Sequence, residues 1–172
     1  PYIKASENIH EMIDGSFFID SDEKIYLSRA SETGIIVKEF NECKRNDTDF
    51  ALFNNELVIK EAKVGRWNEG PFILKRYGKY YLTYTGTHFL SSAYRVEYVS
   101  GKSLNNLKYK DCLLLSTSKD YYGLGHSMNI LGPNLDSDFI VYHSMNDYGI
   151  RRFNIARLLF KDVQLKQIKF FL

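Results

Sequence analysis

The feature that most constrains the fold of this chain is a hairpin pattern that occurs three times. Each copy has an apolar strand, a polar turn containing Gly, Asn or Asp, and an aromatic-rich strand, which is typical of β-hairpins. The copies read SFFIDSDEKIYLSRAS, PFILKRYGKYYLTYTG and SMNILGPNLDSDFIVYHSM. Their turns are predicted at residues 20–23, 77–78 and 132–138. The chain is therefore expected to consist of repeated antiparallel units.

Strand-like segments also fill the sequence between the hairpins, and helical periodicity is nowhere sustained for ~11 residues. These further strands are predicted at residues 35–40, 56–60, 94–99, 111–116, 153–160 and 163–170. Four short strands in each repeat of about 55 residues favour the blades of a β-propeller. A β-sandwich also contains many short strands, but it does not explain a repeated hairpin. We predict an all-β fold, one partial propeller domain over residues 1–172, with blades at about 14–66, 67–123 and 124–172.

Composition narrows the choice of partner. The net charge is only +2 and the charged residues are interspersed, which argues against nucleic acid or an anionic membrane. No apolar run approaches the ~18–20 residues of a transmembrane helix. The first residues lack the layout of a signal peptide. This absence does not decide the location of the protein, and a cytoplasmic and a secreted location both stay open. Cys43 and Cys112 have no metal-ligand spacing; they are expected to be buried thiols, and a disulfide stays open.

The register of the repeat points to a group of ionisable residues. An offset of 55 residues aligns the first two hairpins and places Asp14 on Glu69, since 69 − 14 = 55. His126 stands just before the third hairpin, as Glu69 stands before the second. The first strand of every propeller blade lines the central axis. We therefore expect these three side chains to converge at one end of the axis.

Paired carboxyl groups in such a funnel suggest acid–base chemistry. Two neighbouring carboxyl groups repel when both are ionised, so one of them has its pKa raised. A carboxylic acid that stays protonated is the general acid needed to cleave a glycosidic bond, where a second carboxylate serves as base or nucleophile. The alternative is structural: Asp14 and Glu69 each precede a Gly and could cap local turns, and His126 could be a structural histidine.

Four segments resemble glycoside hydrolase family 43, in order and over nearly the whole chain. EGPFILKRYGKYYLTYTG resembles the strand pair that bears the catalytic acid, and IDGSFFIDSDEKIYL resembles the blade before it. GLGHSMNI with FIVYHSM resembles the last blade, and IRRFNIARLLF resembles the closing strand. The resemblance implies the C-terminal part of a five-bladed propeller, of the β-xylosidase and α-L-arabinofuranosidase type.

The resemblance also implies roles for individual residues. Glu69 would be the general acid, and Asp14 would orient it and tune its pKa. His126 would help to hold a hydrated cation, calcium, near the axis, and Arg151 would bind the sugar. The implied reaction is hydrolysis, with inversion, of β-xylosides or α-L-arabinofuranosides in plant-type oligosaccharides or polysaccharides.

Two aromatic residues are further candidates for sugar contacts. Trp67 is the only tryptophan and lies two residues before Glu69, so it could stack on a sugar face or pack between blades. Phe89 follows His88 in the segment after the second hairpin and is expected to border a sugar subsite.

The sequence departs from the family pattern in two places. Ala156 stands where an Asp is usual in the closing strand. Family members carry their general base near the start of the first blade, whereas only 13 residues precede Asp14 here. The first blade and most of the second are therefore expected to be missing, and the chain alone to lack the base. It is expected to associate with the missing portion or with itself; a non-catalytic carbohydrate-binding propeller and an interaction module remain alternatives.

Overall fold

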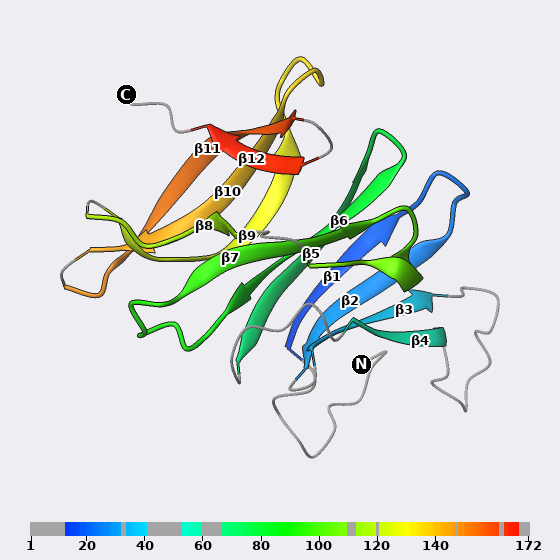
Figure 1. The fold of residues 1–172 in the computed structure, drawn as a ribbon, viewed down its shortest axis with the longest axis horizontal. Helices are drawn as coiled ribbons and strands as arrows, with labels where there is room; N and C mark the ends of the chain where they lie inside the picture. The colour runs from blue at the N-terminus through cyan, green and yellow to red at the C-terminus, as the bar shows by residue number, and fades with distance from the viewer. Residues whose placement is uncertain are drawn as a thin grey trace.

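The computed structural model describes residues 13–31, 34–40, 53–59, 67–109, 113–119, 121–146, 148–161 and 164–168. Within these residues the chain forms three antiparallel sheets, each of four strands in chain order (Figure 1). No helix in these ranges is long and apolar enough to cross a membrane. The predicted all-β class is confirmed, and the sheets are blades of a partial β-propeller.

The strands of the three sheets have the following bounds. The first sheet contains β1 (Ile13–Ile19), β2 (Ile25–Ser31), β3 (Gly34–Phe40) and β4 (Phe53–Ile59). The second contains β5 (Asn68–Arg76), β6 (Lys79–Gly86), β7 (Arg95–Gly101) and β8 (Leu113–Leu115). The third contains β9 (Tyr122–Leu131), β10 (Asp138–Met145), β11 (Arg151–Lys161) and β12 (Gln164–Ile168). The three predicted hairpins are thus β1–β2, β5–β6 and β9–β10, and every other predicted strand is present.

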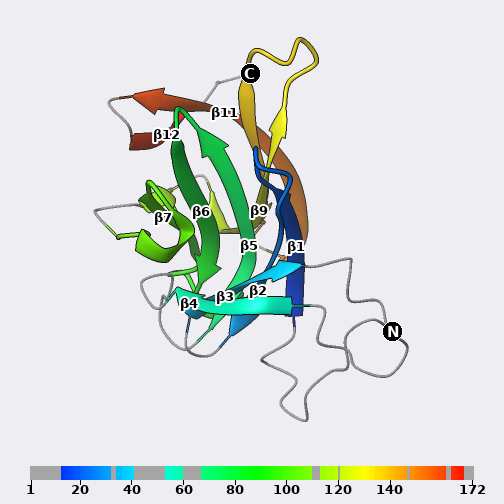
Figure 2. The same cartoon turned by 90° about the vertical axis from the view of Figure 1, so that its right-hand side faces the viewer.

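The first strand of each sheet lies innermost. β5 packs against both β1 and β9, and Figure 1 shows it between them. Turned by 90°, the view shows strand β4 at the outer edge of the first sheet and β12 at that of the third (Figure 2). This arrangement places the beginnings of β1, β5 and β9 together, as the propeller prediction required.

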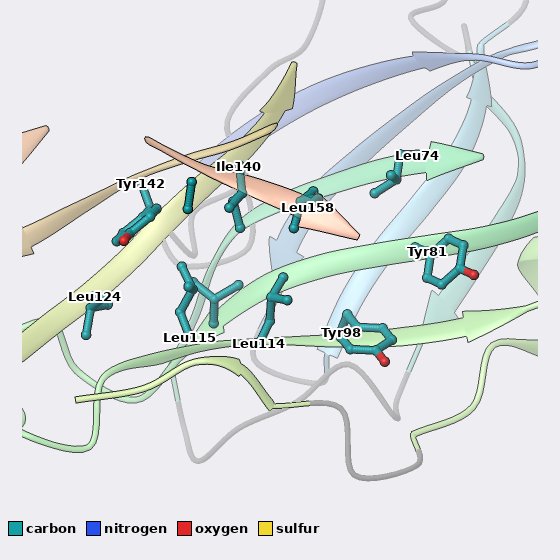
Figure 3. Close-up of a cluster of buried hydrophobic side chains, with 11 residues drawn as sticks. Leu74, Tyr81, Tyr98, Leu114, Leu115, Leu124, Ile140, Tyr142 and Leu158 are labelled. Atoms are coloured by element: carbon teal, nitrogen blue, oxygen red, sulfur yellow. The ribbon is translucent and has the colours of Figure 1, made fainter. Parts of the chain in front are cut away.

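Two apolar clusters hold the sheets together. The cluster between the second and third sheets is shown in Figure 3 and consists of Leu74, Tyr81, Val96, Tyr98, Leu114, Leu115, Leu124, Ile140, Tyr142, Ala156 and Leu158. The cluster between the first and second sheets includes Ile35, Val37, Ile73, Leu82, Tyr84 and Val99. Fully burying one large apolar side chain contributes ~1.5–3 kcal/mol. Ala156, which replaces an acidic residue of the family pattern, is only 4% exposed inside the first cluster.

A polar clasp joins the second sheet to both neighbours at the end where the hairpins turn. Lys75 donates to Asp20 at 2.5 Å, and the hydroxyl of Tyr80 donates to the other oxygen of the same carboxylate. Arg76, the next residue along β5, donates to the carboxylate of Asp138 in the third sheet at 2.7 and 3.1 Å. Two consecutive cations therefore connect all three sheets.

The clasp predicts a loss of stability in acid. Burial raises the pKa of Asp20, but the hydrogen bonds from Lys75 and Tyr80 outweigh burial and lower the pKa from 3.8 to about 2. A lowered folded-state pKa stabilises the protein above the unfolded value, and that stabilisation is lost as the pH falls from about 4 to about 2. Asp20→Asn is expected to cost ~1–2 kcal/mol at pH 6 and to flatten this dependence.

Urea unfolding at pH 6, 4 and 2.5 measures this effect. The matched control is Asp22→Asn in the same turn, because Asp22 pairs with Lys24 at 3.5 Å and both side chains are about half exposed. Exposed pairs contribute little, so the control should stay within ~0.5 kcal/mol of the wild-type chain. Equal losses in the two variants would contradict the clasp.

Candidate active site

β-bulges interrupt each innermost strand. β1 and β5 each contain one extra residue opposite the strand that follows, and β9 contains two, at separate places. Three of these bulges, one in each strand, contain Asp14 (φ 59°), Gly70 (φ 52°) and His126 (φ 47°), whose backbone is left-handed. Such a φ is strained for Asp and His, and bulges and strained residues are over-represented next to active sites. The three bulges therefore mark one end of the axis as the place to look for a site.

The structure corrects the sequence alignment of the first two repeats by one residue. Asp14 is equivalent to Gly70 and not to Glu69, because the bulges recur at a spacing of 56 residues (70 − 14 and 126 − 70). The positions paired just after the bulge are 12 residues apart in the first hairpin and 11 in the second, at Ser16–Ser28 and Phe72–Thr83. A sequence alignment that uses one constant offset for the whole hairpin therefore misaligns the first strands by one residue. Glu69 lies one residue before the left-handed position.

The three left-handed residues lie against one another. The backbone N–H of Gly70 donates to Oδ2 of Asp14 at 3.0 Å. On its other side, a Cβ added to Gly70 would lie 3.1 Å from Cα of His126. Nε2 of His126 lies 3.9 Å from Oδ1 of Asp14. The structure therefore brings Asp14 and His126 together, as expected from sequence, with a glycine between them at which a side chain would be crowded and strained.

Glu69 is held on both carboxyl oxygens. Its side chain is buried, with the residue only 9% exposed. The indole N–H of Trp67 donates to Oε1 at 2.5 Å, and the hydroxyl of Tyr94 donates to Oε2 at 2.5 Å. Because the N–H of the next residue, Gly70, bonds to Asp14, the backbone at Glu69 is also fixed relative to the other carboxylate.

Aromatic rings and one cation border this carboxyl group. The ring of Trp67 meets that of His88 edge-on at 5.9 Å, and His88 stacks on Phe89 at 4.5 Å. The guanidinium of Arg151 lies 5.5 Å from the centre of the Phe89 ring. The three residues predicted to bind sugar, Trp67, Phe89 and Arg151, thus form one continuous row that begins at Glu69. Carbohydrate sites use such rings because a sugar face is partly apolar.

Sequence and structure comparisons identify the family of this chain. The sequence profile described as Glycosyl hydrolases family 43 matches residues 1–162. The chain belongs to this family. No curated protein sequence matches the chain.

Solved structures of family 43 enzymes are similar to the chain. A thermostable family-43 glycoside hydrolase is 25% identical, with a TM-score of 0.72, over 90% of this chain and 57% of its own. An endo-1,4-β-xylanase from Bacteroides thetaiotaomicron is 24% identical, with a TM-score of 0.72, over 92% of this chain and 58% of its own. An exo-1,5-α-L-arabinanase from a bovine ruminal metagenomic library is 16% identical, with a TM-score of 0.77, over 96% and 60%. The family 43 chain thus spans about three-fifths of the length of these relatives.

Sequence reasoning missed Tyr94, which contacts Glu69 in the candidate site, because it was predicted only as the start of a strand. Burial raises its pKa, and so does its hydrogen bond to Glu69. Its ring is fully buried and stacks on His143 at 5.7 Å. Burial lowers the pKa of His143 to about 4, and so do its electrostatic interactions with Arg151 and His126. His143 is therefore neutral at neutral pH, and its uncharged ring stacks on that of Tyr94.

A cleft of about 380 Å³ lies elsewhere in this family 43 chain. It is lined by the later halves of β1, β5 and β9, including Asp20, Lys75, Arg76 and Asp138 of the clasp. These residues are at the turn end of the innermost strands, whereas Glu69 lies near their beginning. The cleft is therefore at the other end of the axis and is not the candidate active site.

Proposed function

We propose that this chain supplies the general-acid half of an inverting glycosidase that acts on β-xylosides or α-L-arabinofuranosides. The observation that carries the proposal is the buried carboxyl of Glu69, fixed by Trp67 and Tyr94 at the start of the row of sugar-binding side chains. Family membership supports glycoside hydrolysis. The xylanase and arabinanase among the similar structures support a xylosyl or arabinosyl substrate in an oligosaccharide or polysaccharide.

In the proposed reaction Glu69 protonates the oxygen of the departing sugar as the glycosidic bond breaks. Asp14 holds the peptide N–H of Gly70 and thereby fixes the backbone next to the acid. Phe89 and Arg151 bind the sugar beside it, and water attacks the anomeric carbon from the opposite face. The base that activates this water is proposed to come from a part of the propeller beyond the described residues.

Exposed apolar side chains on the first and third sheets support the proposal that further protein packs against these sheets. Phe17 and Ile19 of β1 are 60% and 68% exposed, and Phe153 and Ile155 of β11 are 74% and 51% exposed. Contiguous exposed apolar surface of this kind marks an interface. We propose that these two faces pack against additional propeller blades.

The calcium ion expected from the resemblance is likewise a proposal. His126 would offer one imidazole nitrogen, and water the remaining ligands. Calcium prefers six to eight oxygen ligands. Among the residues that the structure describes, no three His, Cys, Asp or Glu side chains are grouped so that they could hold a metal ion. The described side chains therefore do not form a calcium site by themselves, and the proposed steps use side chains only.

Assays on aryl β-xyloside and aryl α-L-arabinofuranoside, with and without sodium azide, test the function. Azide has no proton to lose, so it can attack the anomeric carbon without a base. We expect little hydrolysis in water alone, and with azide a glycosyl azide of inverted configuration together with the free phenol. The product is identified by NMR.

A carbohydrate-binding propeller without turnover is the second candidate. The row formed by Trp67, His88, Phe89 and Arg151 favours it, because this row does not depend on a base. Quenching of Trp67 fluorescence by xylo- or arabino-oligosaccharides, with no product formed in the presence of azide, would exclude the catalytic proposal and support this one.

A further inference from the structure

We propose that Tyr94 is the positioning residue of the acid, and that with Trp67 it confines the transferable proton of Glu69 to a single oxygen, Oε2. This inference rests on the proposed role of Glu69 as the general acid. It adds a residue and an atom to that role.

The hydrogen-bonding capacity of the two partners decides which oxygen carries the proton. An indole N–H is a donor only, so Oε1 of Glu69 must accept from Trp67 whether the carboxyl is ionised or protonated. A phenolic hydroxyl can donate or accept. Oε2, which faces Tyr94, is therefore the only one of the two oxygens on which a proton meets no competing donor. A glycosidic oxygen must approach Oε2 to be protonated.

Tyr94 is rigidly placed for this task. Its residue is 0% exposed, and its ring stacks on His143 with an angle of 25° between the planes. Gly125 of β9 leaves the space that the ring occupies, because a Cβ there would lie 2.0 Å from Cε1 of Tyr94. The ring is thus clamped between β9 and β10, while its hydroxyl reaches β5.

The charged and titratable groups around Tyr94 come from several strands. Besides Glu69, the charges of Asp14 on β1 and Arg151 on β11 act on its hydroxyl. Arginine keeps its charge at all relevant pH values. His143 on β10 has its pKa lowered to about 4 by burial and by Arg151 and His126, so it changes charge only in acid. Because Tyr94 donates directly to Glu69, ionisation of Glu69 is the event expected to change the hydrogen bond of Tyr94.

The only tryptophan of the 172-residue chain reports on this event. Trp67 donates directly to Glu69, so its fluorescence should change as the carboxyl loses its proton. In the ionised state the hydroxyl of Tyr94 donates to the carboxylate and stabilises it. Tyr94→Phe removes this donor and should move the midpoint of the fluorescence titration to higher pH by about one unit. Glu69→Gln should abolish the transition.

Tyr80→Phe is the matched control. Its hydroxyl also donates to a carboxylate, but to Asp20 at the clasp and not to Glu69. It should leave the Trp67 midpoint unchanged, and circular dichroism should show both phenylalanine variants to be folded. An unchanged midpoint in Tyr94→Phe, or a transition that survives in Glu69→Gln, would overturn the proposal.

A measurement on the unchanged chain covers the case in which Tyr94→Phe does not fold. With tyrosine labelled at Cζ, one ¹³C resonance should move with the same midpoint as the Trp67 fluorescence, and it should stay fixed in Glu69→Gln. The absence of any such resonance would refute the contact. Neither titration requires turnover. A chain that forms no product even with azide, but titrates as expected, would contradict the proposed function and leave the role of Tyr94 intact.

Discussion

Turnover of alkyl glycosides is expected to fall by ~10²-fold or more when Glu69 becomes glutamine, whereas turnover of activated aryl glycosides should fall far less. Glutamine fills the same space, but it cannot give a proton to the departing oxygen. A poor leaving group needs that proton and an activated phenol does not. The measurement is azide-supported turnover of a matched pair of xylosides, one with an alkyl and one with a nitrophenyl leaving group.

Glu97→Gln is the control for effects on folding. Glu97 is also a buried glutamate of the second sheet, 4% exposed, and it accepts hydrogen bonds from Arg95 at 2.6 Å and Tyr84 at 3.3 Å. Its replacement should lower stability and affect both substrates equally. An equal loss on both substrates in Glu69→Gln would show that Glu69 is not the acid.

The fold could be predicted from sequence because its determinants are local and repeated. Short apolar runs mark β1 and β5, and Gly78 supplies a left-handed turn residue (φ 69°) between β5 and β6. The same strand–turn–strand pattern recurs three times, which predicted a fold built of repeated units. The strand ends were less certain, because pairing decides them: β4 begins at Phe53, three residues before the predicted strand.

The site could be predicted only in part. Asp14 and Glu69 were found because each is the second residue of an innermost strand. His126 was expected just before its strand but is the fifth residue of β9, and the packing of the innermost strands still brings it to Asp14. The alignment of Asp14 with Glu69 in the repeat was wrong by one residue. The first hairpin is one residue longer than the second, and this difference changes neither the strand pattern nor the turn signal in the sequence. Tyr94 has no local signal at all: it reaches Glu69 across 25 positions of sequence. Cys43 and Cys112 lie outside the described residues.

Gly125 connects the packing of the third sheet to the geometry of the acid, which gives the second large prediction. A methyl group at this position would lie 2.0 Å from Cε1 and 2.5 Å from Cζ of the Tyr94 ring, and 2.7 Å from Cγ2 of Thr85. Both residues are fully buried, so neither can move aside without displacing the core. Gly125→Ala is expected to lower the free energy of unfolding by about 3 kcal/mol. It should also separate Tyr94 from Glu69.

Gly15→Ala is the control for this substitution, since Gly15 belongs to the bulge of β1 and a Cβ there would meet its nearest neighbour, Leu27, at an ordinary 3.4 Å. Its free energy of unfolding should change by less than ~1 kcal/mol. Urea unfolding measures both losses, and the Trp67 titration of Gly125→Ala should move toward that of Tyr94→Phe. Wild-type stability in Gly125→Ala would show that the ring of Tyr94 lies elsewhere. A large loss with an unmoved titration midpoint would show that the ring packs here but does not hold the acid. The two readouts separate the structural role of Tyr94 from its proposed role in positioning the proton of Glu69.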